Sequence, residues 1–226
     1  MGVTPSWKVN AAGWIRAIEQ SELANRELVT SRAILEAIQQ LNPSTLLDMG
    51  CGEGWLVRIL RSQGVAADGL DRTLEYIHCA TAKDCTEHYF LLSYEEVLAG
   101  RLNKRSYDAI VFNFSLLEKE LTEKLLAYLP SLLNHKGHLL IQTLHPFRWN
   151  FNQPYQSHWE SQFDETLPAL LRITPPWYAR TISDWIHLVL NSGFQLVRIE
   201  EPLCLVTQQP ISLLLVAQKH CQGNVA

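Results

Sequence analysis

Three glycines in five positions precede a run of helix-forming residues, and they are the first candidates for a ligand site. The stretch LLDMGCGEGWLVRIL, residues 46–60, places Gly50, Gly52 and Gly54 shortly after Asp48. Glycine allows a backbone turn at positive φ and lets a ligand approach the main chain. A helix that starts after such a loop presents unpaired N–H groups and a partial positive charge. The pattern predicts a loop that cradles a ligand, with a plain tight turn as the alternative.

An acidic residue at the end of the next apolar segment favours the ligand over the plain turn. Asp71 ends VAADGLD and follows Gly50 by about 20 residues, the spacing expected of a carboxylate that binds a ribose. A dinucleotide fingerprint, G-x-G-x-x-G/A, needs a small residue where this chain has Trp55. Because an indole prevents close packing of the helix on the strand, the dinucleotide interpretation fails at that position.

The elements that must position these residues alternate between strand and helix. We expect a strand over 44–49 and a helix from about 53 to 63, and the alternation continues to residue 145, with a long amphipathic helix over 118–135. Such alternation predicts βαβ crossovers and an α/β fold, a doubly wound and mostly parallel sheet with helices on both faces. The segments 194–203 and 210–220 have no room for a crossover helix between them, so we expect them to be antiparallel.

Two further segments flank this pattern. Residues 10–41 have helical periodicity and Asn42-Pro43 ends it, so we expect an N-terminal helical cap over 1–43 and the main domain over 44–226. Residues 146–180 are rich in proline and aromatic residues and have little periodicity. Linkers are poor in aromatic residues, so a folded lid is the better interpretation of about 146–180.

The pattern D-x-G-x-G-x-G at Asp48 to Gly54, with Asp71 after the second strand, resembles the class I S-adenosylmethionine-dependent methyltransferases. The resemblance covers about 44–145 and 181–219, and it implies a Rossmann-like sheet of seven strands in the order 3-2-1-4-5-7-6 with the last strand antiparallel. The tail RTISDWIHLVLNSGFQLVRIEEP, residues 181–202, is also similar to the small-molecule branch near the ubiquinone-biosynthesis methyltransferases.

The resemblance also implies S-adenosyl-L-methionine as the cofactor, S-adenosyl-L-homocysteine as the product, and a set of binding residues. In the family the glycine loop lies beneath the methionyl part, the carboxylate takes both ribose hydroxyls, and the next residue borders the adenine. The family often has an acidic residue after the third strand, where this chain has Ser93 and Tyr94; a hydroxyl or a stacked ring is the expected substitute. The implied cofactor-binding residues are Asp48, Gly50, Cys51, Gly52, Gly54, Asp71, Arg72, Ser93, Tyr94, Asn113, Phe114 and Ser115.

Methyl transfer requires little acid–base catalysis from the protein, because the sulfonium already activates the methyl group. His145, at the end of the fifth expected strand, is the candidate catalytic base, with a structural role as the alternative. An aromatic lid would exclude water and suit a planar or apolar acceptor. The candidate residues of the acceptor pocket are Arg148, Trp149, Trp159, Trp177, Tyr178 and Arg180.

The composition and charge of the chain disfavour some classes of binding partner. The formal net charge of −4 does not favour nucleic acid, and no apolar run approaches the ~20 residues of a membrane helix. The five cysteines form no CxxC pair, so we expect free thiols, a cytoplasmic location and no metal.

We therefore expect a methyltransferase that acts on a small-molecule acceptor, at an oxygen atom, as a monomer or homodimer. A binding module without catalysis, and a nicotinamide-dependent oxidoreductase, remain as alternatives. RNA methylation is disfavoured by the acidic charge balance.

Overall fold

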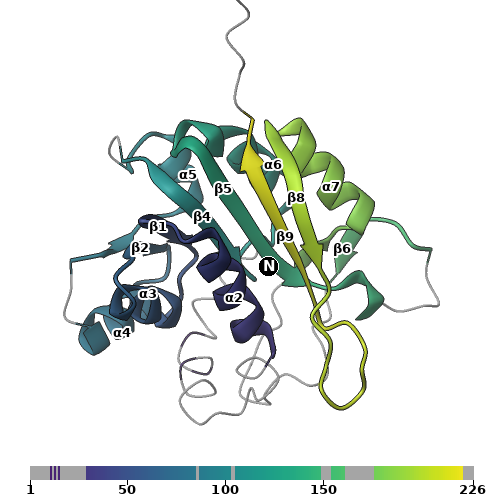
Figure 1. Ribbon diagram of the computed structural model, residues 1–226, viewed down its shortest axis with the longest axis horizontal. Coiled ribbons are helices and arrows are strands. Elements are labelled where there is room, and N and C mark those ends of the chain that lie inside the picture. The colour runs from purple at the N-terminus through teal and green to yellow at the C-terminus, as the bar shows by residue number, and fades with distance from the viewer. Residues whose placement is uncertain are drawn as a thin grey trace, which may run out of the picture.

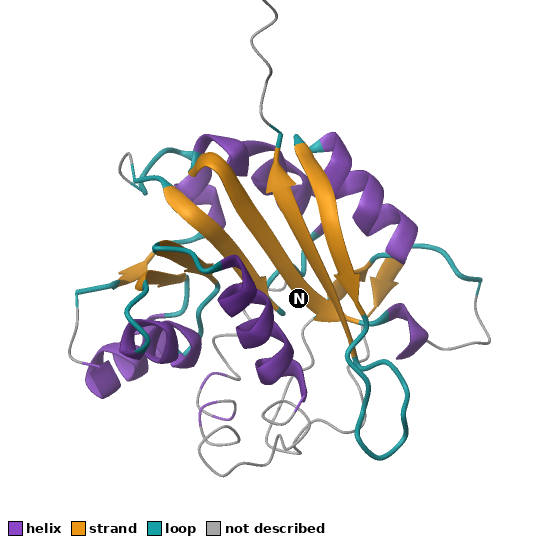
Figure 2. Ribbon diagram, viewed as in Figure 1, coloured by secondary structure: helices purple, strands orange, loops and turns teal. Residues whose placement is uncertain are grey.

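The computed structural model describes residues 11, 13, 15, 29–84, 87–102, 105–148, 154–160 and 176–220. Within them, seven strands form one mixed sheet with helices on both faces (Figure 1, Figure 2). In spatial order the strands are β3 (Tyr89–Leu91), β2 (Ala66–Asp71), β1 (Thr45–Met49), β4 (Tyr107–Asn113), β5 (Leu133–Leu144), β9 (Ser212–Lys219) and β8 (Phe194–Glu200). The expected α/β class is confirmed, and so is the order, because β8 and β9 are the sixth and seventh strands of this sheet.

Strand direction also follows the expectation. The pairs β1–β2, β1–β4, β2–β3 and β4–β5 are parallel, whereas β9 is antiparallel to both β5 and β8. The last strand is therefore the reversed one. The connection from β8 to β9 is short, and it is closed by an isolated bridge between Leu203 and Pro210.

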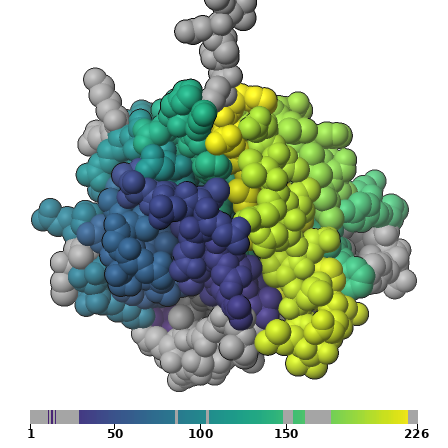
Figure 3. Space-filling view, viewed as in Figure 1, coloured from purple at the N-terminus to yellow at the C-terminus, as the bar shows by residue number. Residues whose placement is uncertain are grey.

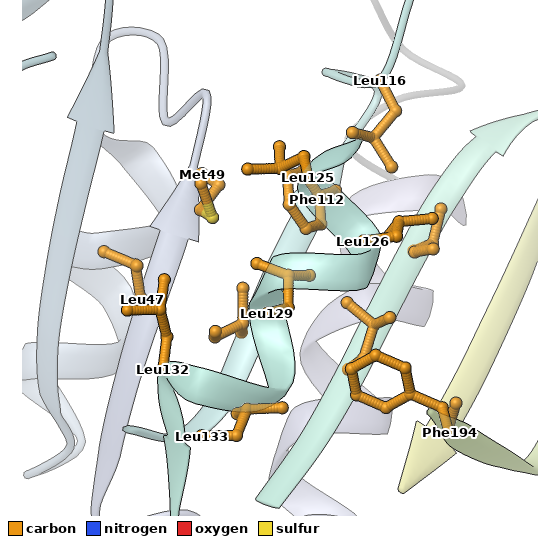
Figure 4. Packing of buried hydrophobic residues seen from close by; sticks show 14 of the residues in the cluster. Leu47, Met49, Phe112, Leu116, Leu125, Leu126, Leu129, Leu132, Leu133 and Phe194 are labelled. Carbon is orange, nitrogen blue, oxygen red and sulfur yellow. The ribbon is translucent and has the colours of Figure 1, made fainter. Parts of the chain in front are cut away.

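The sheet separates two apolar cores. On one face lie α2 (Ser31–Leu41), α3 (Trp55–Ser62) and α4 (Leu74–Asp84), and on the other lie α5 (Tyr94–Leu98), α6 (Lys119–Tyr128) and α7 (Ile182–Asn191). Successive side chains of a strand point to opposite faces, so Leu46 packs in the first core and Leu47 in the second. Figure 4 shows Leu125 and Leu126 of α6, with Leu129 of the turn that follows it, in the same cluster as Leu47 and Phe112. Burial on both faces explains why the central strands are nearly continuous apolar runs.

The amphipathic helix expected over 118–135 is shorter in the structure. Helix α6 ends at Tyr128, a 3₁₀ turn, η2 (Leu129–Ser131), follows it, and β5 begins at Leu133. Pro130 explains the difference, because proline lacks an N–H group and its ring clashes with the carbonyl group four residues earlier. The expected boundary at residue 135 is therefore wrong.

Helix α2 packs directly on the sheet. Ile34 and Ile38 are buried in the same core as α3, and the Nε2 of Gln142 in β5 donates to the carbonyl oxygen of Thr30 at 3.1 Å. Val29 also meets Cys204 and Ile211 of the β8–β9 connection, and Figure 3 shows these segments side by side on the surface. The cap over 1–43 and its boundary stay a prediction, since most of that range lies outside the described residues.

The described part of the expected lid contains regular structure that periodicity did not reveal. A 3₁₀ turn, η3 (Pro146–Arg148), follows β5, and β6 (His158–Glu160) pairs antiparallel with β7 (Trp177–Ala179) in a separate two-stranded sheet. Strands of three residues are too short to show a sequence period. Among the described residues, no helix has the length and apolar character needed to span a bilayer.

Candidate functional site

The carboxyl ends of β1 and β4 form the centre of the candidate site. After β1 the chain turns to α3 on one face of the sheet, whereas after β4 it turns to α6 on the other face (Figure 1). The two loops therefore leave the sheet in opposite directions, which makes this place the topological switch point of the sheet. Ligands of open α/β sheets bind at such a point.

Backbone hydrogen bonds hold the glycine loop against the end of β2. The N–H groups of Gly50 and Cys51 both donate to the carbonyl oxygen of Leu70, at 2.8 and 2.9 Å. One residue further, the N–H of Gly52 donates to Oδ2 of Asp71 at 3.1 Å. The loop after β1 and the carboxylate after β2 are thus one connected unit.

The Asp71 carboxylate is oriented by the protein and retains capacity for a ligand. Its Oδ1 accepts the N–H of Thr73 at 2.8 Å, and its Oδ2 accepts that of Gly52. Burial raises the pKa of Asp71 above its usual value, and these hydrogen bonds oppose the shift. The side chain of Thr73 also hydrogen-bonds to Asp71. An ionised carboxylate accepts about four hydrogen bonds, so acceptor capacity remains for a ligand donor such as a sugar hydroxyl.

The three glycines of the loop have positive φ but different surroundings. A Cβ at Gly50 would lie 2.5 Å from Cβ of Ser115, and one at Gly54 would lie 2.7 Å from the ring of Tyr89. At Gly52 a Cβ would meet no atom within 4 Å. Protein packing therefore requires Gly50 and Gly54, whereas the bare backbone of Gly52 faces open space beside Asp71. This open cradle fits the sugar and tail of the adenosyl cofactor that the family resemblance implies.

The other predicted residues of the loop are buried. Cys51 lies against Gly69, where a Cβ would come within 2.9 Å of its Sγ, and burial raises the pKa of its thiol well above the usual value. The thiol is therefore a packing group rather than a nucleophile. Asp48, in β1, is also buried and contributes to the raised pKa of Cys51. Direct contact of either side chain with a ligand stays a prediction.

The hydroxyl groups of Ser93 and Tyr94, after β3, form hydrogen bonds within the protein. Ser93 caps α5 with a capping box, in which its Oγ accepts the N–H of Glu96 at 3.3 Å and its own N–H donates to Oε2 of Glu96 at 2.9 Å. The hydroxyl of Tyr94 donates toward the carbonyl oxygen of Met49 at 3.1 Å. Contact of these two residues with adenine stays a prediction, and these hydrogen bonds do not favour it.

The loop after β4 lies beside the glycine loop, and contact of its residues with a cofactor stays a prediction. Asn113 ends the strand, and its Oδ1 is a buried acceptor without a hydrogen-bond partner among the described residues. Phe114 has a φ of 57°, which is unusual for a residue with a side chain, and its N–H donates to the carbonyl oxygen of Gln142. Ser115 reaches back to β1 through its Oγ. A buried acceptor at this place fits a ligand that offers N–H or O–H donors.

Arg72 forms an ion pair with Glu118, a residue that the sequence did not indicate as part of the site. Its Nη1 is 3.8 Å from Oε1 of Glu118, which precedes α6, and both side chains are about one-third exposed. Burial raises the pKa of Glu118, and Arg72 opposes that shift. The pair joins the ends of β2 and β4 beside Asp71, so Glu118 belongs to the candidate site. Because the pair depends on tertiary structure, no sequence spacing marks it.

Glu53 lies within the glycine loop, between Gly52 and Gly54. It is buried, and its Oε2 pairs with Nη2 of Arg58 at 2.6 Å and with Nζ of Lys83 at 3.4 Å. These contacts tie the glycine loop to α3 and α4. We infer that Glu53 orders the loop, a role consistent with a carboxylate at the start of a helix.

His145 is buried at the end of β5, and both of its ring nitrogens are engaged. Nδ1 accepts the N–H of Phe147 at 2.9 Å, and Nε2 lies 2.7 Å from Oε1 of Glu201. An Nδ1 that accepts leaves the proton on Nε2, which then donates to the Glu201 carboxylate. These contacts favour the structural role over the base, because no ring lone pair is left for a substrate proton.

The lid residues fall into two groups. Trp149 and the side chain of Arg148 lie outside the described residues. Trp159 and Tyr178 pair across β6 and β7 with ring centroids 5.5 Å apart, and Trp159 is 51% exposed, whereas Trp177 is buried. The N–H of Tyr178 donates to the carbonyl oxygen of Leu117 at 2.7 Å, which anchors β7 beside the loop after β4.

Arg180 is buried between β7 and the helices α6 and α7. Its guanidinium lies over the rings of Tyr178 and Trp185, at 4.8 and 5.1 Å, and Nη2 donates to the carbonyl oxygen of Lys119 at 2.9 Å. Burial lowers the pKa of Arg180. These contacts favour a role in holding the lid, and its role in an acceptor pocket stays a prediction. In the described part of the chain, no group of three or more His, Cys, Asp or Glu residues is arranged to hold a metal ion.

The contrast between Gly50 and Gly52 predicts different costs for the same substitution. Gly50→Ala should lower the free energy of unfolding by about 2–4 kcal/mol, because the methyl group collides with Ser115 and the positive φ is strained. Gly52→Ala should cost only about 1–2 kcal/mol, from the strained φ alone. Urea denaturation of both variants measures the difference, and equal costs would contradict the description of the loop.

The contacts of His145 predict its tautomer. Nitrogen NMR of the protein with labelled histidine should show the ring proton of His145 on Nε2, with Nδ1 unprotonated. His145→Gln, which keeps a donor and an acceptor, should be more stable than His145→Ala by about 1–3 kcal/mol. A tautomer protonated on Nδ1 would leave Nε2 with a lone pair and restore the candidate base.

Comparison with known proteins agrees with this geometry. A family model described as a methyltransferase domain matches residues 22–199. A sequence search of curated proteins finds no match. Among solved structures, an S-adenosylmethionine-dependent methyltransferase from Mesorhizobium loti is similar with a TM-score of 0.62 and 21% identity, over 81% of this chain and 96% of that one.

Two other similar structures contain a bound cofactor or product. One is the 1,6-didemethyltoxoflavin-N1-methyltransferase of Burkholderia thailandensis with bound 1,6-didemethyltoxoflavin and S-adenosylhomocysteine, at a TM-score of 0.66 and 15% identity over 98% of this chain and 92% of that one. The other is the magnesium protoporphyrin IX methyltransferase of Synechocystis with bound S-adenosylmethionine, at a TM-score of 0.56 and 17% identity over 84% and 77% of the two chains. These likenesses agree in fold, and the family match covers more than half of the sequence. The chain belongs to the methyltransferase domain family.

Proposed function

We propose that this methyltransferase transfers a methyl group from S-adenosyl-L-methionine to a small-molecule acceptor, at an oxygen atom. The observation that carries the proposal is the hydrogen bond from Gly52 N–H to Oδ2 of Asp71, which joins the open glycine loop to a carboxylate with acceptor capacity left. A nucleoside with an amino-acid tail needs both features side by side, one for its sugar diol and one for its tail.

Different described residues would bind different parts of the cofactor. Asp71 would accept the ribose hydroxyls, and the backbone at Gly52 would lie beneath the methionyl part. Asn113 offers its buried Oδ1 to a donor at the end of β4, and Arg72 with Glu118 borders the base. When bound, S-adenosylmethionine supplies a methyl group already activated on a sulfonium. The residues of this chain are then required to position the reactants and to exclude water, which supplies much of the rate.

The acceptor is expected over the ends of β4 and β5, beneath the lid. Trp159 and Tyr178 form an aromatic pair beside the loop after β4, and Lys119 Nζ lies 5.4 Å from the centre of the Tyr178 ring. Such a surface suits a planar acceptor. His145 then acts by positioning the start of the lid through Phe147, and a hydroxyl acceptor loses its proton to solvent or to a residue outside the described part of the chain.

Two other functions are distinguishable. A binding module without catalysis would bind the product S-adenosylhomocysteine but methylate nothing. A nicotinamide-dependent oxidoreductase is disfavoured by Trp55 and by the reversed β9. Membership of the ubiquinone-type branch, a cytoplasmic location and a monomeric or homodimeric state stay predictions.

A transfer assay tests the proposal directly. The protein is incubated with S-adenosylmethionine that carries a labelled methyl group and with a panel of phenols, carboxylic acids, amines and thiols. We expect transfer to a phenol or carboxylate oxygen, with S-adenosylhomocysteine as an inhibitor. Transfer to nitrogen or sulfur alone would contradict the oxygen assignment. Tight binding of S-adenosylhomocysteine without transfer to any acceptor of the panel would favour the binding module.

Removal of the Asp71 carboxylate should weaken the binding of S-adenosylhomocysteine. Hydrogen bonds to a charged group contribute about 1.5–3 kcal/mol, so Asp71→Ala should raise the dissociation constant about 10- to 150-fold in calorimetry. Asp108→Ala is the matched control, because Asp108 also accepts two backbone N–H groups, those of Ser44 and Thr45, but at the opposite end of β1. The control should lower stability and leave the affinity within about 2-fold; equal affinity of the two variants would remove Asp71 from the site.

A further inference from the structure

Tyr94 comes from α5, on the opposite face of the sheet from α3, yet its hydroxyl reaches the carboxyl ends of β1 and β4. It lies 3.1 Å from the carbonyl oxygen of Met49, the last residue of β1, and 3.4 Å from that of Ser115, after β4. The ring stands edge-on to Phe112 in β4, with centroids 5.9 Å apart and planes at 78°. The side chain therefore spans the point where the two strands diverge.

Ser115 reaches the same carbonyl group from the other side. Its Oγ donates to the oxygen of Met49 at 2.6 Å. The Cβ that Gly50 lacks would lie 2.5 Å from Ser115 Cβ and 2.9 Å from the hydroxyl of Tyr94. The first peptide of the glycine loop is thus enclosed by these two side chains, and the hydrogen bonds of Gly50 and Cys51 to Leu70 complete the enclosure.

We propose that Tyr94 and Ser115 are positioning residues, which hold the carbonyl group of Met49 and thereby set the place of the glycine loop relative to Asp71 and β4. In this role Tyr94 acts through the loop and neither stacks on the adenine nor binds its amino group. The proposal rests on the proposed adenosyl site and adds a role for these two residues in its affinity.

The rest of the Tyr94 environment agrees with this role. Burial raises the pKa of its hydroxyl, so the group stays protonated and remains a donor at neutral pH. The single O–H of Tyr94 lies closer to the carbonyl oxygen of Met49 than to that of Ser115, and a phenylalanine ring could donate to neither. A loop that is preformed in the free protein pays less ordering cost when a ligand binds, which makes such a clamp relevant to affinity and not only to stability.

The test compares two tyrosine-to-phenylalanine variants in the full chain. Tyr94→Phe removes the clamp, and Tyr107→Phe is the matched control, because its hydroxyl donates to Oδ2 of Asp68 at 2.8 Å, away from the loop. Both variants lose one buried hydroxyl and keep the ring, so both should show a lower melting temperature. Only Tyr94→Phe should raise the dissociation constant of S-adenosylhomocysteine, by about 3- to 10-fold. The constant is measured by calorimetry at a temperature about 15 °C lower than the melting temperatures of both variants.

Ser115→Ala provides a second, independent variant and should raise the dissociation constant by a similar factor. In the double variant, the dissociation constant should rise by less than the product of the two single factors, because both side chains act on one carbonyl group. If Tyr94→Phe binds S-adenosylhomocysteine within 2-fold of the wild type, or if Tyr107→Phe weakens binding equally, the positioning role is overturned. If the wild type itself does not bind S-adenosylhomocysteine, the proposed function fails and this inference fails with it. If the wild type binds and Tyr94→Phe binds equally well, only this inference fails, so the two failures are distinguishable.

Discussion

A single backbone hydrogen bond, from the N–H of Gly52 to the carboxylate of Asp71, joins the two halves of the candidate site. It exists because β1 and β2 are adjacent parallel strands whose carboxyl ends lie at the same edge of the sheet. The loop after β1 is thereby oriented by the residue that ends β2. Any ligand that binds one of these features necessarily lies beside the other, so the spacing of loop and carboxylate selects a ligand with a diol close to a polar tail.

Most of the glycine loop is shaped by protein contacts rather than by the space for a ligand. Gly50 is enclosed by Ser115 and Tyr94, Gly54 lies under the ring of Tyr89, and Glu53 ties the loop to two helices. Only Gly52 leaves its surroundings open. A loop held in this way before a ligand arrives avoids part of the ordering cost of binding. The charged pair of Arg72 and Glu118 lies beside Asp71 at the same edge of the sheet.

The features that the sequence predicts well are those set by local pattern. The alternation of apolar strands with helices predicts the sheet, and the glycines with Asp71 predict the loop and its carboxylate, because strand geometry places both at one edge. The end of α6 was missed because apolar residues continue past Pro130. Glu118, Glu201 and the contacts of Tyr94 could not be predicted, because each depends on which side chain a distant segment brings near. His145 illustrates the same limit: its position at a strand end is predictable, but the engagement of both ring nitrogens is not.

A crystal structure of the protein with S-adenosylhomocysteine is the most direct test of the central claim. We predict that both ribose hydroxyls will lie within hydrogen-bond distance of the Asp71 carboxylate, with the homocysteine tail against the backbone of Gly52. A structure in which the Trp55 indole fills that space, or in which Asp71 faces solvent while the sugar binds elsewhere, would contradict the account.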